Sequence, residues 1–130
     1  MFGSFVQVEG LSALRIQPTD NIYGHTKKLR FILKHLNDYV NSHERPIFVL
    51  DFGCGNGIAV SHFLIQEGVS YYGVDCHEPS RNYAIKHFQR ENAVFLNSTP
   101  QGILFDIIVY ADILEHLENP LCVLKEHFKI

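Results

Sequence analysis

An apolar run that stops at an acidic residue and continues into three alternate glycines constrains the fold of this chain more than any other feature. The run is residues 47–50 (IFVL), followed by Asp51 and by glycines at positions 53, 55 and 57. It is short, partly β-branched and preceded by Pro46, which is typical of a buried strand rather than a helix. The glycines therefore predict a tight turn from this strand into a helix.

The same glycines indicate that something approaches the backbone of the turn closely. A Cβ at Gly53, Gly55 or Gly57 would block either the required backbone angles or the approach of a ligand to bare main chain. The N-terminus of the following helix also offers unpaired N–H groups. We therefore expect a nucleotide-type site here.

The spacing of the glycines distinguishes between cofactors. A dinucleotide fingerprint, G-x-G-x-x-G, would need its third glycine at position 58, which is Ile58. The observed pattern, Asp51-x-Gly53-x-Gly55-x-Gly57, resembles the first motif of the class I S-adenosylmethionine-dependent methyltransferases. The resemblance implies that Asp51 orders the turn and that the backbone around Gly53 and Gly55 holds the methionine end of the cofactor.

A second carboxylate follows the next predicted strand, residues 71–75. Asp75 lies 22 residues beyond Gly53 (75 minus 53), where it can reach over the crevice and accept both ribose hydroxyls. NAD would use the same acid, so Asp75 predicts a nucleoside without choosing between the two cofactors. A helix-capping role is the plain structural alternative.

The third predicted strand, residues 93–96, is followed by Asn97 and Ser98. The resembling family usually has an acid here that holds the adenine amino group, and an Asn carbonyl can still accept from that amine. The resemblance also implies a cofactor-binding role for Cys54 and Cys76, which stand beside the glycines and Asp75.

The fourth predicted strand, residues 105–111, carries a lone carboxylate, and a Leu-Glu-His-Leu segment at 114–117 follows it. This arrangement resembles the fourth motif of small-molecule methyltransferases. The resemblance implies that Tyr110 and Ala111 face the reacting centre.

Two residues of that segment are candidates for catalysis. His116 can act as a base because an imidazole titrates near neutrality, and Glu115 can orient it or meet a cation. Asp112 and Glu115 also have the spacing of a capping box, in which His116 simply covers the helix. Both interpretations remain open.

Helical spacing between the strands predicts an α/β fold in one domain, residues 1–130. We expect helices over residues 20–41, 58–67 and about 79–90, and a last helix from Asn119 that places Leu121, Leu124 and Phe128 on one face. The family resemblance implies a Rossmann-like open parallel sheet in the order 3-2-1-4, with helices on both faces. The C-terminal strands of the full methyltransferase fold are absent from the sequence.

The ends of the chain leave two questions open. Residues 1–19 are compatible with a strand, a hairpin or a loosely packed arm. The apolar fourth strand is expected at an open edge of the sheet, where it would pair or aggregate unless covered. Either the chain is a fragment, or a second copy or another chain covers that edge.

Charge and cysteine content exclude several other classes. A net charge of -3 gives no footprint for nucleic acid or an anionic membrane, and no apolar run is long enough to span a bilayer. Three cysteines without a C-x-x-C pair predict neither a disulfide framework nor a metal site. We expect reduced thiols in the cytoplasm.

The leading hypothesis is methyl transfer from S-adenosylmethionine to an oxygen, nitrogen or carbon of a small molecule. The sulfonium already activates the methyl group, so the protein must align the acceptor and exclude water. A non-catalytic or truncated module that binds this cofactor or a partner is one alternative. A nicotinamide oxidoreductase fragment with the same half-fold is another.

Overall fold

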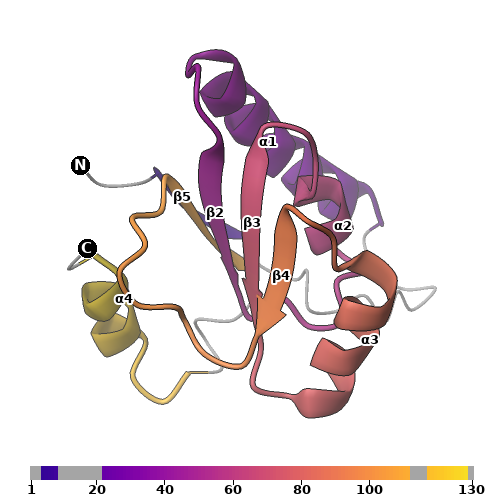
Figure 1. Cartoon of the computed structure of the whole chain (residues 1–130), viewed down its shortest axis with the longest axis vertical. Coiled ribbons are helices and arrows are strands. Elements are labelled where there is room, and N and C mark those ends of the chain that lie inside the picture. Colours follow the sequence, from indigo (N-terminus) through magenta and orange to yellow (C-terminus); the bar gives the residue numbers. More distant parts are fainter. Residues whose placement is uncertain (1–3, 9–21, 112–116, 129–130) are drawn as a thin grey trace.

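A parallel sheet forms the centre of the molecule. The computed structural model describes residues 4–8, 22–111 and 117–128, and within them five strands pair in the order β1-β5-β2-β3-β4 (Figure 1). The strands are β1 (Ser4–Val8), β2 (Ile47–Phe52), β3 (Val69–Val74), β4 (Ala93–Leu96) and β5 (Ile107–Ala111). The helices are α1 (Ile22–Asn41), α2 (Ser61–Leu64), α3 (Glu78–Phe88) and α4 (Pro120–Phe128). All pairings between these strands are parallel, which confirms the predicted order 3-2-1-4 as β4-β3-β2-β5.

The N-terminal arm supplies a strand that the sequence left undecided. β1 pairs with β5 along its whole length, from Ser4 opposite Ile107 to Val8 opposite Ala111. The expectation of an open edge at the fourth predicted strand is therefore wrong, because β1 covers one side of β5 and β2 the other. The backbone groups of β5 need no partner chain to be paired.

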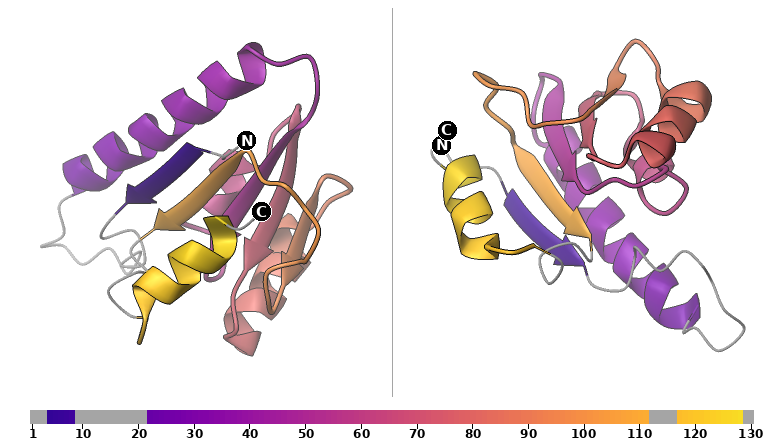
Figure 2. Two further views of the ribbon diagram at one scale, coloured as in Figure 1. Left: turned by 90° about the vertical axis from the view of Figure 1, so that its left-hand side faces the viewer. Right: turned by 90° about the horizontal axis from the view of Figure 1, so that it is seen from below.

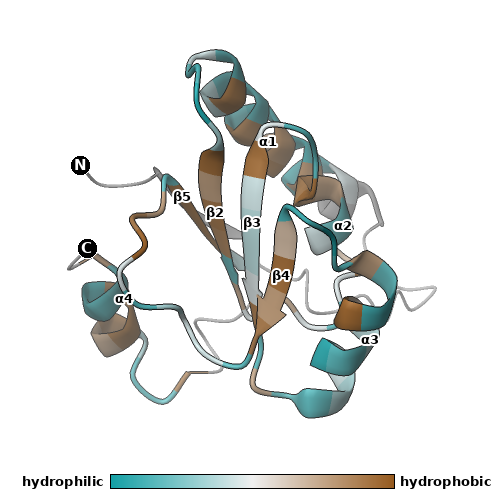
Figure 3. Cartoon of the chain, viewed as in Figure 1, coloured by the Kyte–Doolittle hydropathy of each residue, from teal (hydrophilic) through white to brown (hydrophobic). Residues whose placement is uncertain are grey.

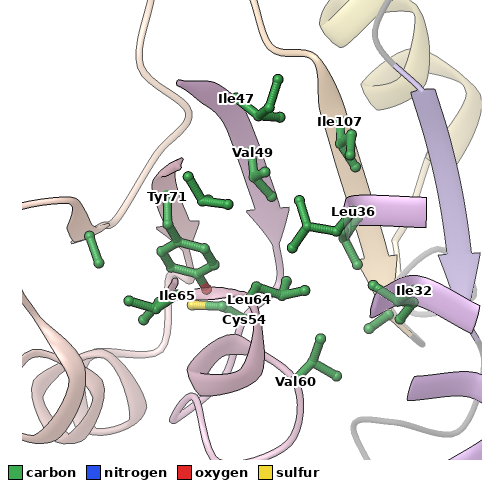
Figure 4. Packing of buried hydrophobic residues seen from close by; sticks show 14 of the residues in the cluster. Ile32, Leu36, Ile47, Val49, Cys54, Val60, Leu64, Ile65, Tyr71 and Ile107 are labelled. Atoms are coloured by element: carbon green, nitrogen blue, oxygen red, sulfur yellow. The ribbon is translucent and has the colours of Figure 1, made fainter. Parts of the chain in front are cut away.

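Alternate residues of the strands feed two cores, one on each face of the sheet. Ile47 and Val49 of β2 pack with Ile32 and Leu36 of α1 on one face (Figure 4). Leu50 belongs to the second core, against which α4 packs. Both views in Figure 2 place α1 and α4 on opposite faces, and Figure 3 shows apolar residues along β2, β4 and β5. Helices on both faces, as predicted, thus follow from the two-residue period of the strands.

α2 is much shorter than predicted. Instead of residues 58–67, only Ser61–Leu64 is helical. Ile65 adopts an extended backbone conformation, with φ -81° and ψ 100°, and its side chain is buried in the core. The helix therefore ends after one turn because the chain must bring Ile65 inward.

α4 turns a different face to the sheet than its apolar residues predicted. Leu121 is 59% exposed, whereas Val123 and Leu124 pack on the core and His127 is buried.

None of the described helices is long and apolar enough to cross a membrane.

An ion pair joins the starts of β2 and β5. The Arg45 guanidinium donates to both carboxylate oxygens of Asp106, at 2.8 and 2.6 Å, and the backbone N–H of Phe48 donates to Asp106 Oδ2 at 2.8 Å. Burial alone would raise the pKa of Asp106, but these hydrogen bonds and the Arg45 charge together lower it. The carboxylate of the fourth predicted strand thus holds the amino end of the sheet.

Deleting residues 1–8 tests the role of β1. The deletion leaves one row of β5 backbone groups unpaired, so we expect the shortened protein to self-associate as its concentration rises. Size-exclusion chromatography with light scattering measures this, with the full chain at matched concentrations as control. A shortened protein that stays monomeric and equally stable would contradict the role assigned to β1.

Candidate functional site

The predicted site residues gather at the carboxyl end of the sheet because the strands that carry them run parallel. The glycine turn follows β2, Asp75 follows β3, Asn97 and Ser98 follow β4, and Ala111 ends β5. Figure 1 shows β3 and β4 pointing toward the same end of the sheet. Strand order therefore places the turn beside Asp75, with Asn97 one strand further away.

The turn closes over the end of β3. The N–H groups of Gly53 and Cys54 both donate to the carbonyl oxygen of Val74, at 2.7 and 3.1 Å. Gly53, Gly55 and Gly57 have positive φ angles of 80°, 60° and 84°. The alternate glycines are thus required by the backbone, as their spacing predicted.

Asp75 and the turn are joined directly. The N–H of Gly55 donates to Asp75 Oδ2 at 2.8 Å, and the N–H of His77 donates to Oδ1 at 2.8 Å. Arg81 donates to the backbone carbonyl of Asp75 at 2.9 Å. Each carboxylate oxygen has a second lone pair, so the fixed Asp75 side chain can still accept ligand hydroxyls.

Two of the glycines face different surroundings. A Cβ added to Gly55 would meet no atom of the described residues within 4 Å, whereas one added to Gly57 would lie 2.7 Å from the ring of Phe88 on α3. The space beside Gly57 is therefore taken by the protein itself. Within the part of the chain that the structure describes, the bare backbone of Gly55 faces open space.

Asp51 and Cys54 lie below the turn, out of solvent. Asp51 is 1% exposed, and Ser61 and Tyr71 donate to its carboxylate. Burial, reinforced by the charges of Asp51 and Asp75, raises the pKa of the Cys54 thiol, which consequently stays protonated. Cys54 is therefore unsuited to act as a nucleophile.

Asn97, Ser98 and Cys76 are exposed beside these elements. Ser98 Oγ lies 3.4 Å from Asn97 Oδ1 and donates to it. Their predicted roles toward a cofactor remain predictions. Within the described residues, no group of three or more His, Cys, Asp or Glu side chains is placed to hold a metal ion.

Tyr110 lies in the second core, fully buried. Its hydroxyl is hydrogen-bonded to His127 Nδ1 of α4, and Thr99 Oγ1 lies 3.1 Å from His127 Nε2. Sequence reasoning missed His127, although its spacing from Val123 and Leu124 places it on the same side of α4. The role of Tyr110 and Ala111 at the reacting centre remains a prediction, and so do the roles of Glu115 and His116, which lie outside the described residues together with Asp112.

Residues 23–130 match a family model described as a methyltransferase domain. Two curated relatives are ubiquinone biosynthesis O-methyltransferases. The Rickettsia akari (strain Hartford) protein is 24% identical over 98 residues, which cover 71% of this chain and 39% of the relative. The Idiomarina loihiensis protein is 28% identical over 98 residues, which cover 67% and 40%. This chain thus spans about two fifths of the length of these relatives.

Two solved structures share the fold. The plantazolicin methyltransferase BpumL, in complex with a triazolic desmethylPZN analog and SAH, aligns with a TM-score of 0.66 and 22% identity over 90% of this chain and 45% of that one. Magnesium protoporphyrin IX methyltransferase (ChlM) from Synechocystis PCC 6803, with bound SAM, aligns with a TM-score of 0.61 and 21% identity over 86% and 59%.

The buried His127 predicts an acid-sensitive stability. Burial lowers its pKa below the ordinary value of 6.5, against an opposing effect of Glu126. Below pH 6.5 the unfolded chain therefore binds more protons than the folded one, and stability falls until the pH reaches the folded pKa. The slope is limited to about 1.4 kcal/mol per pH unit for one group.

Urea unfolding between pH 5 and 8 measures this slope in the wild-type protein, His127→Gln and His87→Gln. His87 is exposed in the last turn of α3 and serves as the surface-histidine control. His127→Gln should flatten the slope. Parallel pH profiles for the wild-type protein and His127→Gln would contradict the prediction.

Proposed function

Because this chain belongs to the methyltransferase-domain family, we propose that it binds S-adenosylmethionine at the carboxyl end of its sheet and takes part in methylating a small-molecule acceptor. The observation that carries the proposal is the hydrogen bond from the Gly55 N–H to Asp75. It places the open backbone of Gly55 next to a fixed carboxylate. That arrangement suits a ligand with both a ribose and an extended amino-acid chain. The curated relatives are O-methyltransferases, which favours an oxygen acceptor.

Each candidate residue would contact the part of the cofactor that lies nearest to it. Asp75 would accept the ribose hydroxyls, the open backbone at Gly55 would admit the methionine end, and Asn97 or Ser98 would receive the adenine amino group. The sulfonium of the bound cofactor supplies an activated methyl group. The chain's own task is then to hold the two reactants in line and to keep water out.

A second candidate is a module that binds the cofactor without transferring its methyl group. It is favoured by the alignment, in which the chain spans 39% and 40% of the two curated relatives. Incubation with S-adenosylmethionine labelled in the methyl group and a panel of hydroxylated acceptors separates the two candidates. Labelled product supports the enzyme, whereas tight binding without product supports the module.

The cofactor itself is tested by calorimetry. We expect saturable binding of S-adenosylhomocysteine and none of NAD, in keeping with the family match. Saturable binding of NAD alone would overturn the proposal in favour of the nicotinamide alternative.

The three cysteines are free thiols, which supports the cytoplasmic location that we include in the proposal.

Replacing Asp75 removes the proposed ribose acceptor. Asp75→Ala should weaken binding of S-adenosylhomocysteine by about tenfold or more, because a ligand hydroxyl and the N–H of Gly55 both lose an acceptor. Glu78→Ala, an exposed acid in the first turn of α3, is the matched control and should bind normally. Equal affinities of the two variants would count against the assigned role of Asp75.

A methyl group at Gly55 tests the open backbone. Gly55→Ala and Gly102→Ala both place a side chain at positive φ, 60° and 77°, with no atom of the structurally described segments within 4 Å. Both should therefore lose about 1 kcal/mol of stability by thermal or urea unfolding. Only Gly55→Ala should also lose affinity for S-adenosylhomocysteine, since Gly102 lies beyond Asn97 and Ser98 on the connection that leads back to the start of β5. Equal affinities would show that the ligand does not approach Gly55.

A further inference from the structure

The carboxylate below the glycine turn is held by two hydroxyl groups from different elements. Tyr71 of β3 donates to Asp51 Oδ2 at 2.7 Å, and Ser61, the first residue of α2, donates to the same oxygen at 2.8 Å. Ser61 and Tyr71 are 0% and 1% exposed, so water does not compete for these bonds. Asp51 of β2 is therefore connected both to β3, through Tyr71, and to α2, through Ser61.

The fold keeps a space for the Tyr71 hydroxyl. Val49 lies opposite Tyr71 in the parallel ladder, and Asp51 lies opposite Gly73. A Cβ at Gly73 would lie 2.9 Å from the Tyr71 hydroxyl and 2.7 Å from the ring of Phe95. Glycine at this position thus allows the tyrosine ring to lean along the strand and reach the carboxylate. Figure 4 shows Tyr71 directed toward the turn, beside Cys54.

The two donors are neutral, which matters for the charge of Asp51. Burial raises the pKa of Asp51, the hydrogen bonds from Tyr71 and Ser61 lower it, and the charge of Asp75 raises it further, with a raised pKa as the result. Burial and then the charge of Asp51 raise the pKa of Tyr71 well above its ordinary value, so its hydroxyl remains a donor. Among the described residues, the titratable groups around Asp51 are Tyr71 on β3, Cys54 in the turn and Asp75 beyond β3.

We propose that Tyr71, assisted by Ser61, is a positioning residue that fixes the Asp51 carboxylate below the turn and keeps it charged when a cationic cofactor binds. The inference rests on the proposed function, because S-adenosylmethionine carries a sulfonium and an ammonium group. A charged Asp51 attracts such a ligand through the poorly screened interior, and a protonated Asp51 does not. Tyr71 thereby sets the lowest pH at which the cofactor binds well.

Tyr71→Phe removes the hydroxyl and leaves the ring in the core. Loss of this donor raises the pKa of Asp51, so a larger fraction of the carboxyl is protonated at any given pH. Calorimetry with S-adenosylmethionine and S-adenosylhomocysteine between pH 6 and 8.5 should show about threefold to tenfold weaker binding at pH 7. The fall in affinity on the acid side should also begin at a higher pH. Ser61→Ala should shift binding in the same direction.

Tyr72→Phe is the matched control. Tyr72 is the next residue of the same strand, but it packs with Phe48 and Phe105 against the other core. Its replacement should leave both the affinity and the pH profile as in the wild-type protein. A merely structural role of Tyr71 would lower stability or affinity without moving the pH profile.

A measurement without ligand supports the test. The side-chain carboxyl carbon of Asp51, followed by NMR as a function of pH, should titrate at a higher pH in Tyr71→Phe than in the wild-type protein. An unchanged titration, or a binding profile that matches that of Tyr72→Phe, would overturn this inference alone. Failure of the wild-type protein and Tyr72→Phe to bind either ligand would overturn the proposed function, and this inference with it.

Discussion

Parallel pairing of β2 with β3 determines where the glycine turn and Asp75 of the candidate site lie. The ladder runs from Ile47 opposite Val69 to Phe52 opposite Val74, so the two strands end together. The carbonyl of Val74 then receives the first N–H groups of the turn, and the next residue, Asp75, meets Gly55. A shift of one residue in this register would send Asp51 to the other core and separate the turn from Asp75.

The local sequence was enough to predict those parts of the site that depend on backbone conformation. Alternate glycines after an apolar strand predicted both the turn and its positive φ angles, and the second strand placed Asp75 beside it. Contacts between side chains of distant segments were not predictable in this way. Tyr71 looked like an ordinary strand residue, because the feature that makes it a partner of Asp51 is the missing side chain of Gly73 on its own strand.

The difference between local backbone signals and contacts of distant segments also explains where the predicted fold was wrong. Residues 58–67 contain apolar residues at helical spacing, but the tertiary position of Ile65 ends α2 early. α4 was expected to carry Leu121, Leu124 and Phe128 on one face, yet Leu124 packs on the second core while Leu121 is exposed, and a histidine with two hydroxyl partners is buried beside Leu124. β1 stayed undecided from the sequence because a five-residue strand carries little periodic signal of its own, and its partner β5 lies far along the chain.

The pairing of β1 with β5 has a consequence for how the chain reaches its native state. Ser4 and Ile107 are neighbours in the sheet although 103 positions separate them in the sequence (107 minus 4). Closing so long a loop is entropically costly, and contacts of this kind slow folding. During synthesis, β1 leaves the ribosome before β5 and must wait for β5 before it can dock. β1 therefore cannot take its place in the sheet until the segment up to Ala111 has been translated.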